Sequence, residues 1–135
     1  MKKKAVILVV EDEVIIRMEA VQMLEDAGFA VVEACNAHDA LVILESRTDV
    51  RAVFTDINMP GTWDGMRLAR MVRGRWPPIH LIVTSGLMSP DTDDLPPNGR
   101  FISKPYNPAH VVATIRELLS QSSPSDPREQ ARRAA

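Results

Sequence analysis

Short, uninterrupted apolar runs alternate along this chain with longer stretches in which apolar residues recur every three or four positions. An uninterrupted run of this length is typical of a strand buried on both faces, and the three-to-four spacing is typical of a helix with one buried side. Alternation of the two predicts an α/β domain, in which helices cover both faces of a parallel sheet. Five strands are predicted, over residues 5–10, 29–34, 50–55, 79–84 and 100–102.

Residues with strong capping preferences mark the helix ends. The first helix is expected over residues 14–27, and Gly28 is placed to end it. Proline follows the cap of the last helix, at the first helical position, which makes this the clearest helix start in the chain. The expected amino-terminal caps of the second, third and last helices are Asn36, Asp64 and Asn107.

Two stretches depart from the alternation. Residues 86–99 hold three prolines and two glycines, which leaves room for about one helical turn instead of a full helix. Residues 121–135 are polar and without periodicity, so we expect a disordered tail. The predicted organisation is therefore one domain over residues 4–120, with a degenerate fourth helix and no output domain after it.

The composition mainly excludes classes of function and location. The 135 residues are 45% hydrophobic and 25% charged, which is typical of a globular protein. The net charge of -2 argues against direct binding to nucleic acid or to a membrane. The basic start is not a signal peptide, because the apolar run behind it is short and ends in Glu11-Asp12-Glu13. The lone Cys35 is expected to be buried or half-buried, and it fits a reducing cytoplasm, where we place the protein.

Side chains with a shared chemistry stand at the ends of four predicted strands. Parallel strands joined by right-handed crossovers open their carboxyl ends on one edge, so these side chains are expected in one crevice. Clustered carboxylates repel one another and must take up a proton or a cation. Oxygen ligands without histidine or cysteine favour Mg²⁺ or Mn²⁺. The residues are Glu11 and Asp12 after the first strand, Asp56 after the third, Thr84 and Ser85 at the fourth, and Lys104 after the fifth.

The lysine in this set suggests phosphoryl chemistry. The ammonium of Lys104 can pair with a carboxylate at rest and with a phosphoryl oxygen after modification. A cis Lys104-Pro105 bond would aim it inward. Either Ser85 or Thr84 can donate to another phosphoryl oxygen, but not both, because strand neighbours face opposite sides. Asp56 is therefore a candidate nucleophile that forms an aspartyl phosphate. Each of these short motifs alone is common in loops, so the prediction rests on their joint placement at successive strand ends.

Four motifs in this chain resemble those of a receiver domain of a two-component response regulator, of the chemotaxis-regulator type, over residues 4–120. The resemblance implies a flavodoxin-like, doubly wound sheet of five parallel strands in the order 2-1-3-4-5. It also implies a stand-alone phosphoacceptor switch that is not an enzyme beyond its own phosphorylation from a donor and its dephosphorylation. The motifs are Val9-Val10-Glu11-Asp12-Glu13, Thr55-Asp56-Ile57-Asn58-Met59-Pro60-Gly61 with Asp64-Gly65, Thr84-Ser85-Gly86 and Phe101-Ile102-Ser103-Lys104-Pro105-Tyr106.

The resemblance assigns roles to individual residues. Asp56 would accept the phosphoryl group from a sensor histidine kinase or a phosphotransfer protein. Mg²⁺ would be held directly by Asp12, Asp56 and the backbone carbonyl of Asn58, with Glu11 acting through water. The remaining roles are a switch hydroxyl that also binds phosphate, a switch aromatic and a phosphate-binding lysine, matched by Ser85, Phe101 and Lys104.

Two segments depart from the family's usual pattern. The turn Met59-Pro60-Gly61-Thr62-Trp63-Asp64-Gly65 is one residue longer than in many receivers, which alters the loop beside the acceptor and places Trp63 where it can report on the site. The proline-rich residues 86–99 replace the region from which many receivers build a dimer and partner surface. We therefore expect a monomer or a weak phosphorylation-dependent dimer that acts on an unknown downstream protein.

Two other functions fit parts of the pattern. An aspartate-nucleophile phosphatase would carry a second carboxylate two residues after the nucleophile, where Asn58 stands. A receiver-like interaction module that takes no phosphate would usually lack one or more of the acceptor-site residues. The histidines, His38, His80 and His110, have no ligand spacing and are interpreted as structural. Whether phosphorylation creates a dimer, exposes a binding face or passes phosphate onward stays open.

Overall fold

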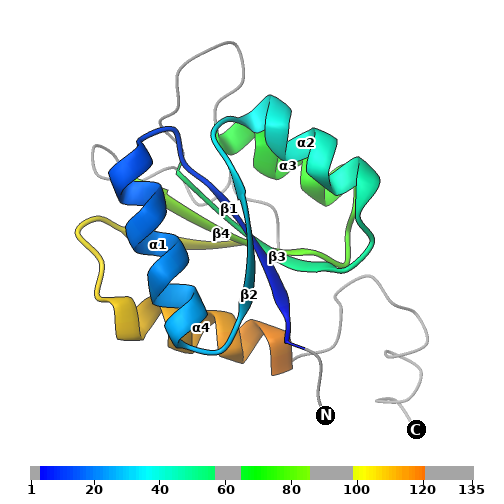
Figure 1. Ribbon diagram of the computed structural model, residues 1–135. Coiled ribbons are helices and arrows are strands. Elements are labelled where there is room, and N and C mark those ends of the chain that lie inside the picture. Colours follow the sequence, from blue (N-terminus) through cyan, green and yellow to red (C-terminus); the bar gives the residue numbers. More distant parts are fainter. Residues whose placement is uncertain (1–3, 57–64, 86–98, 121–135) are drawn as a thin grey trace, which may run out of the picture.

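The computed structural model describes residues 4–56, 65–85 and 99–120. These residues form three layers, in which one parallel sheet lies between two pairs of helices (Figure 1). Several predictions lie outside the described residues: the roles of Asn58 and Trp63, the cap at Asp64, the degenerate helix in residues 86–98 and the tail at 121–135.

The sheet has the predicted topology. Its five strands are all parallel and follow the order β2-β1-β3-β4-β5. Each predicted run matches its strand to within one residue at either end. The strands are β1 (Val6–Val10), β2 (Ala30–Ala34), β3 (Val50–Asp56), β4 (His80–Ser85) and β5 (Gly99–Ser103).

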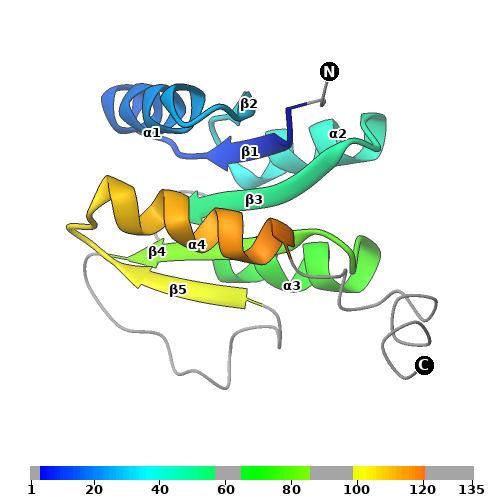
Figure 2. The same cartoon turned by 90° about the horizontal axis from the view of Figure 1, so that it is seen from below.

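Two helices cover each face of the sheet (Figure 2). One face carries α1 (Val14–Asp26) and α4 (Pro108–Ser120), and the other carries α2 (Ala37–Ser46) and α3 (Gly65–Arg75). The longest helices, α1 and α4, have 13 residues each, against the roughly 20 needed to span a bilayer. In the described part of the chain, no helix is long and apolar enough to cross a membrane.

A separate hydrophobic core lies on each side of the sheet. Val53 and Leu81 enter the core under α2 and α3, whereas Phe54 and Ile82 enter the core under α1 and α4. Strand neighbours alternate between the two cores because successive side chains point to opposite faces. The central strands must therefore be apolar at nearly every position, and β1 is buried along its full length. The edge strands β2 and β5 are only partly buried.

The predicted helix ends are confirmed where the structure describes them. Gly28 follows α1 with a φ of 98°, a backbone conformation that glycine adopts without strain. Asn36 caps α2, because its Oδ1 accepts a hydrogen bond from the backbone N–H of Asp39 at 2.7 Å. At the start of α4, Asn107 Oδ1 accepts from the backbone N–H of Ala109 at 2.9 Å.

The cap of α2 can be tested by substitution. Asn36→Ala removes the acceptor of the bond to Asp39, and should lower the free energy of unfolding by about 1 kcal/mol. Asn36→Ser keeps a capping oxygen and should lose only a few tenths of that amount. Urea unfolding followed by circular dichroism measures both variants, and an equal loss in the two would contradict the capping role.

Candidate functional site

The carboxyl ends of the strands bring four predicted side chains around one small cavity. Asp56 ends β3 and lies in register with Thr84 of β4. Glu11 directly follows β1, and Lys104 directly follows β5. These four residues line a cavity of about 10 Å³, which is roughly the space of one water molecule. The predicted convergence of acidic, hydroxyl and lysine side chains at this edge is therefore present.

An ion pair between Lys104 and Asp56 crosses the cavity. Lys104 Nζ donates to Asp56 Oδ2 at 2.7 Å, and the two side chains are only 25% and 10% exposed. Burial alone would lower the pKa of Lys104, but the hydrogen bond and charge of Asp56, together with the charge of Glu11, outweigh burial and raise it. The lysine therefore stays charged at neutral pH and neutralises Asp56 in a place that water screens poorly.

Glu11 is a buried carboxyl group beside this ion pair. It is 5% exposed, and its pKa is raised from 4.5 to about 7. Burial is the main cause, the negative charges of Asp56 and Asp12 add to it, and the charge of Lys104 opposes it. Near neutral pH, Glu11 therefore carries a proton far more often than an exposed glutamate does.

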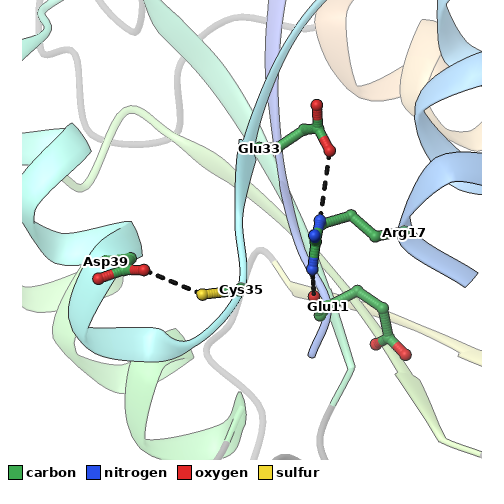
Figure 3. Close-up of polar contacts among 5 residues, drawn as sticks. All are labelled: Glu11, Arg17, Glu33, Cys35 and Asp39. Carbon is green, nitrogen blue, oxygen red and sulfur yellow. Dashed lines mark hydrogen bonds and ion pairs between the residues drawn. The ribbon is translucent and has the colours of Figure 1, made fainter. Parts of the chain in front are cut away.

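Arg17 of α1 fixes the backbone at Glu11, a contact that the sequence analysis did not predict. Its Nη1 donates to the carbonyl oxygen of Glu11 at 2.8 Å, and its Nε donates to Glu33 Oε1 at 3.2 Å (Figure 3). The backbone N–H of Glu11 donates in turn to the carbonyl oxygen of Ala34 at 3.1 Å. Both backbone polar groups of this acidic residue are thus held by neighbouring elements. An arginine in a helix after an acidic turn is too common to have indicated this role.

The prediction of a buried or half-buried Cys35 is wrong. Its side chain is exposed, because the residue follows the end of the edge strand β2. The thiol donates a hydrogen bond to Asp39 Oδ2 at 3.0 Å (Figure 3). That hydrogen bond is the main reason why the pKa of Cys35 is raised, and it leaves the thiol a poor nucleophile at neutral pH.

Two aromatic residues accompany the lysine. Tyr106 lines the small cavity and packs edge-on against Phe54, with ring centroids 5.8 Å apart and an interplanar angle of 74°. Burial is the main cause of the raised pKa of Tyr106. Phe101 is partly buried on β5, in register with Val83 of β4. The role of Phe101 as a switch aromatic stays a prediction.

The remaining site predictions are placed as follows. Thr84, which the sequence ranked below Ser85 as the phosphate-binding hydroxyl, is buried and lines the cavity. The side chain of Ser85 and the whole of Asn58 lie outside the described residues. Asp12 is partly exposed beside Glu11. The Lys104-Pro105 peptide bond is cis, the isomer considered from the sequence.

Comparison with known proteins identifies the family. The family model described as the response regulator receiver domain matches residues 7–116. The chain belongs to this family. This chain is 34% identical to the sensor kinase CckA of Brucella abortus over 121 residues. The matched region covers 87% of this chain but 13% of that protein. The aerobic respiration control protein ArcA of Escherichia coli K12 is 32% identical over 124 residues, 86% of this chain and 49% of that protein. The receiver thus spans less than half the length of these relatives.

A solved structure agrees with the receiver fold. A response regulator receiver protein from Sinorhizobium medicae superposes with a TM-score of 0.82 at 27% sequence identity, covering 87% of this chain and 96% of that one. Receiver domains are typically phosphoacceptor switches and not enzymes, and they interact with histidine kinases or phosphotransfer proteins. They generally bind Mg²⁺ at an acidic phosphorylation site.

The acidic residues of this receiver fit such a cation. Glu11, Asp12 and Asp56 stand near a single lysine, and the pKa of Glu11 responds to the charges of Lys104, Asp56 and Asp12. The available ligand atoms are oxygens, which suit a hard divalent ion. Among the described residues, no group of three acidic, histidine or cysteine side chains forms a metal cluster alone. A cation here would therefore rely on backbone and water oxygens as well, as Mg²⁺ sites commonly do.

The charge on Glu11 predicts a pH-dependent stability. Between pH 4.5 and about 7, the folded protein binds a proton that the unfolded chain has released, so the free energy of unfolding falls as pH rises through this window. A shift of this size corresponds to a loss on the order of 3 kcal/mol. Glu11→Gln carries no titrating group and should not show this loss.

Urea unfolding in a chelator, at about pH 5 and about pH 8, measures the effect. The exposed Glu25 of α1 offers a matched control, since Glu25→Gln should keep the pH dependence of the wild type. Equally steep losses in Glu11→Gln and the wild type would show that Glu11 does not hold the proton.

Proposed function

We propose that this receiver accepts a phosphoryl group on Asp56 from the phosphohistidine of a histidine kinase or a phosphotransfer protein. The 2.7 Å ion pair between Lys104 Nζ and Asp56 Oδ2, set beside the buried Glu11, carries the proposal. A further buried carboxylate beside an ion pair raises the electrostatic cost of folding. An ion pair with a purely structural role would gain nothing from that carboxylate. A site that must hold a cation and a phosphoryl group together needs that excess of negative charge.

In the proposed transfer, an oxygen of Asp56 forms a bond to phosphorus as the bond from phosphorus to the donor's imidazole nitrogen breaks. Negative charge spreads over the equatorial phosphoryl oxygens. The ammonium of Lys104, already against Asp56, can turn to one of those oxygens without crossing the cavity. The imidazole leaves with the electron pair of the broken bond, and later attack by water on the acyl phosphate returns Asp56 to its free form.

A divalent cation, Mg²⁺ or Mn²⁺, would supply neutralisation of phosphoryl charge. The residues that would hold it are Asp12, Asp56 and the backbone carbonyl of Asn58, with Glu11 acting through water. Glu11 would take part as a carboxylate, because a ligand of such a cation must be deprotonated.

The switch hydroxyl and the switch aromatic would change position when Asp56 is phosphorylated. Ser85, or Thr84 in its place, would donate to the phosphoryl group, and Phe101 would move inward from its partly buried position on β5. Such a shift biases a two-state surface toward the form that a downstream protein binds. Onward relay of the phosphoryl group would use the same acyl phosphate.

An exposed apolar patch at the start of α1 suits the phosphodonor protein. Val14, Ile15 and Met18 are 57%, 71% and 60% exposed, although they are large apolar residues. They begin the helix that directly follows the acidic residues of the site. Clustered exposed apolar side chains commonly mark protein-binding surfaces. We infer that this patch contacts the donor while its phosphohistidine reaches Asp56.

Intact-mass spectrometry tests the phosphoacceptor directly. The wild type, incubated with acetyl phosphate and Mg²⁺, should gain the mass of one phosphoryl group, and the gain should vanish when Mg²⁺ is chelated. Asp56→Asn should show no adduct, because its amide cannot act as the nucleophile. Asp26→Asn, on the exposed side of α1, should behave as the wild type. An unmodified wild type that still binds Mg²⁺ would instead favour a receiver-like interaction module.

Substitutions in the apolar patch can distinguish binding of the protein donor from phosphoryl transfer itself. Ile15→Glu should slow transfer from the phosphorylated protein donor by about tenfold, because a charge replaces an apolar contact. Phosphorylation from acetyl phosphate should be unchanged, since that donor needs no protein surface. Val42→Glu alters an equally apolar residue on α2, 52% exposed, and should affect neither rate. Equal slowing by both glutamate variants would remove the patch from the proposal.

A further inference from the structure

A second, larger cavity lies at the opposite edge of the sheet. It has a volume of about 430 Å³, and residues from the carboxyl ends of α2 and α3 and from the starts of β3 and β4 line it. It is about 20 Å from Asp56, the length of β3 at roughly 3.3 Å per residue. Pockets for small ligands commonly measure about 300–1,000 Å³, so the cavity is large enough for a compact organic molecule.

One wall of this cavity is flat and aromatic. It is formed by Trp76 with Pro77 and Pro78, which follow α3. The guanidinium of Arg75 lies 4.5 Å from the centre of the Trp76 ring, a cation–π contact. Rigid rings of this kind provide contact area for another planar group at a low entropic cost.

The cavity is also cationic. Arg47, Arg51 and Arg75 line it, with Glu45 as an acidic neighbour. Two of these arginines are explained by local structure: Arg75 Nη1 pairs with Glu45 Oε1 at 3.0 Å, and Arg47 makes two bonds to Asp49 at 2.9 and 2.7 Å. Both follow or end a helix, where a positive charge also stabilises the helix dipole.

The position of Arg51 at the cavity is not explained by an ion pair of this kind. Its Nη2 makes a long contact of 3.4 Å to the carbonyl oxygen of Leu119, and it forms no ion pair within the described part of the chain. It occupies a β-bulge, since Val50 and Ala52 of β3 pair with the consecutive residues Val6 and Ile7 of β1. Bulges commonly redirect a side chain at functional places, and this one sets an arginine at the cavity.

A buried histidine, His80, also borders the cavity. It lines the cavity at the start of β4 and is 3% exposed. Its Nδ1 is buried with no hydrogen-bond partner among the described residues. Burial, followed by the charges of Arg51 and Arg100, lowers the pKa of His80 and keeps the ring neutral. Because Nδ1 is buried, a ligand in the cavity does not reach it, and Arg51 is the residue left to hold an acidic group.

We propose that this cavity binds a small planar ligand that carries an acidic group, either an aromatic carboxylate or a mononucleotide. The acidic group pairs with Arg51, and the ring packs against Trp76 and the prolines. This binding does not depend on phosphorylation, because the cavity shares no residue with the site at Asp56.

Nuclear magnetic resonance of the Trp63→Phe protein tests the proposal, because Trp76 is then the single tryptophan. The probes are naphthalene-2-carboxylate and adenosine monophosphate, with 2-naphthylmethanol and adenosine as their neutral counterparts. At least one acid should shift the Trp76 indole N–H resonance saturably. Its neutral counterpart should bind about tenfold more weakly, the equivalent of one charge-assisted hydrogen bond. Which acid binds distinguishes the two ligand sources.

Variants in the same background locate the binding. Arg51→Gln should weaken binding about tenfold, whereas Arg70→Gln, an exposed arginine on α3, should leave it unchanged. Thr48→Tyr places a bulky ring among the exposed lining residues and should block the cavity. Asp56→Asn should bind as the wild type even if the phosphoacceptor proposal fails. The proposal is overturned if neither acid gives a saturable shift, or if acid and neutral probes bind equally and Arg51→Gln has no effect.

Discussion

Balance of charge at the carboxyl ends of the strands governs this molecule. The sheet gathers Glu11, Asp12 and Asp56 at one edge, and the ammonium of Lys104 lies 2.7 Å from Asp56. That single positive charge serves three carboxyl groups, and the burial of Glu11, with the charges of Asp56 and Asp12, raises its pKa to about 7. In the proposed function, a divalent cation would add the positive charge that a phosphoryl group needs beside these carboxylates.

The strand order makes this balance possible. Because β4 lies between β3 and β5, Lys104 must reach Asp56 over the end of β4, where Thr84 stands in register with Asp56. On the other side, β1 lies directly beside β3 and delivers Glu11, whose backbone is anchored by Arg17 and Ala34. The acidic, hydroxyl and ammonium groups thus come from four different strands or from the residue directly after one, so strand pairing places them close to one another.

Much of the fold and part of the site could be predicted from the sequence, since both depend on short-range signals. The apolar runs gave the strands, Asn36 and Gly28 marked helix ends, and the strand-end positions of Asp56 and Lys104 predicted their meeting. Features that depend on long-range packing were missed. The hold of Arg17 on Glu11, the exposure of Cys35 and the cavity around Trp76 arise between segments that no local pattern relates.

The bulge at Arg51 has a further consequence, for how the chain tolerates changes in length. From Ala52 onward β3 pairs without interruption with β1 as far as Thr55 and with β4 as far as Asp56, so residues 52–56 form a segment of fixed register. An insertion within this segment would move the residues after it to the opposite faces of the sheet and turn Asp56 away from Lys104. An insertion before the segment, in the connection from α2, can be absorbed where the register is already broken. One edge of the sheet can therefore change in length while Asp56 at the other edge stays in place.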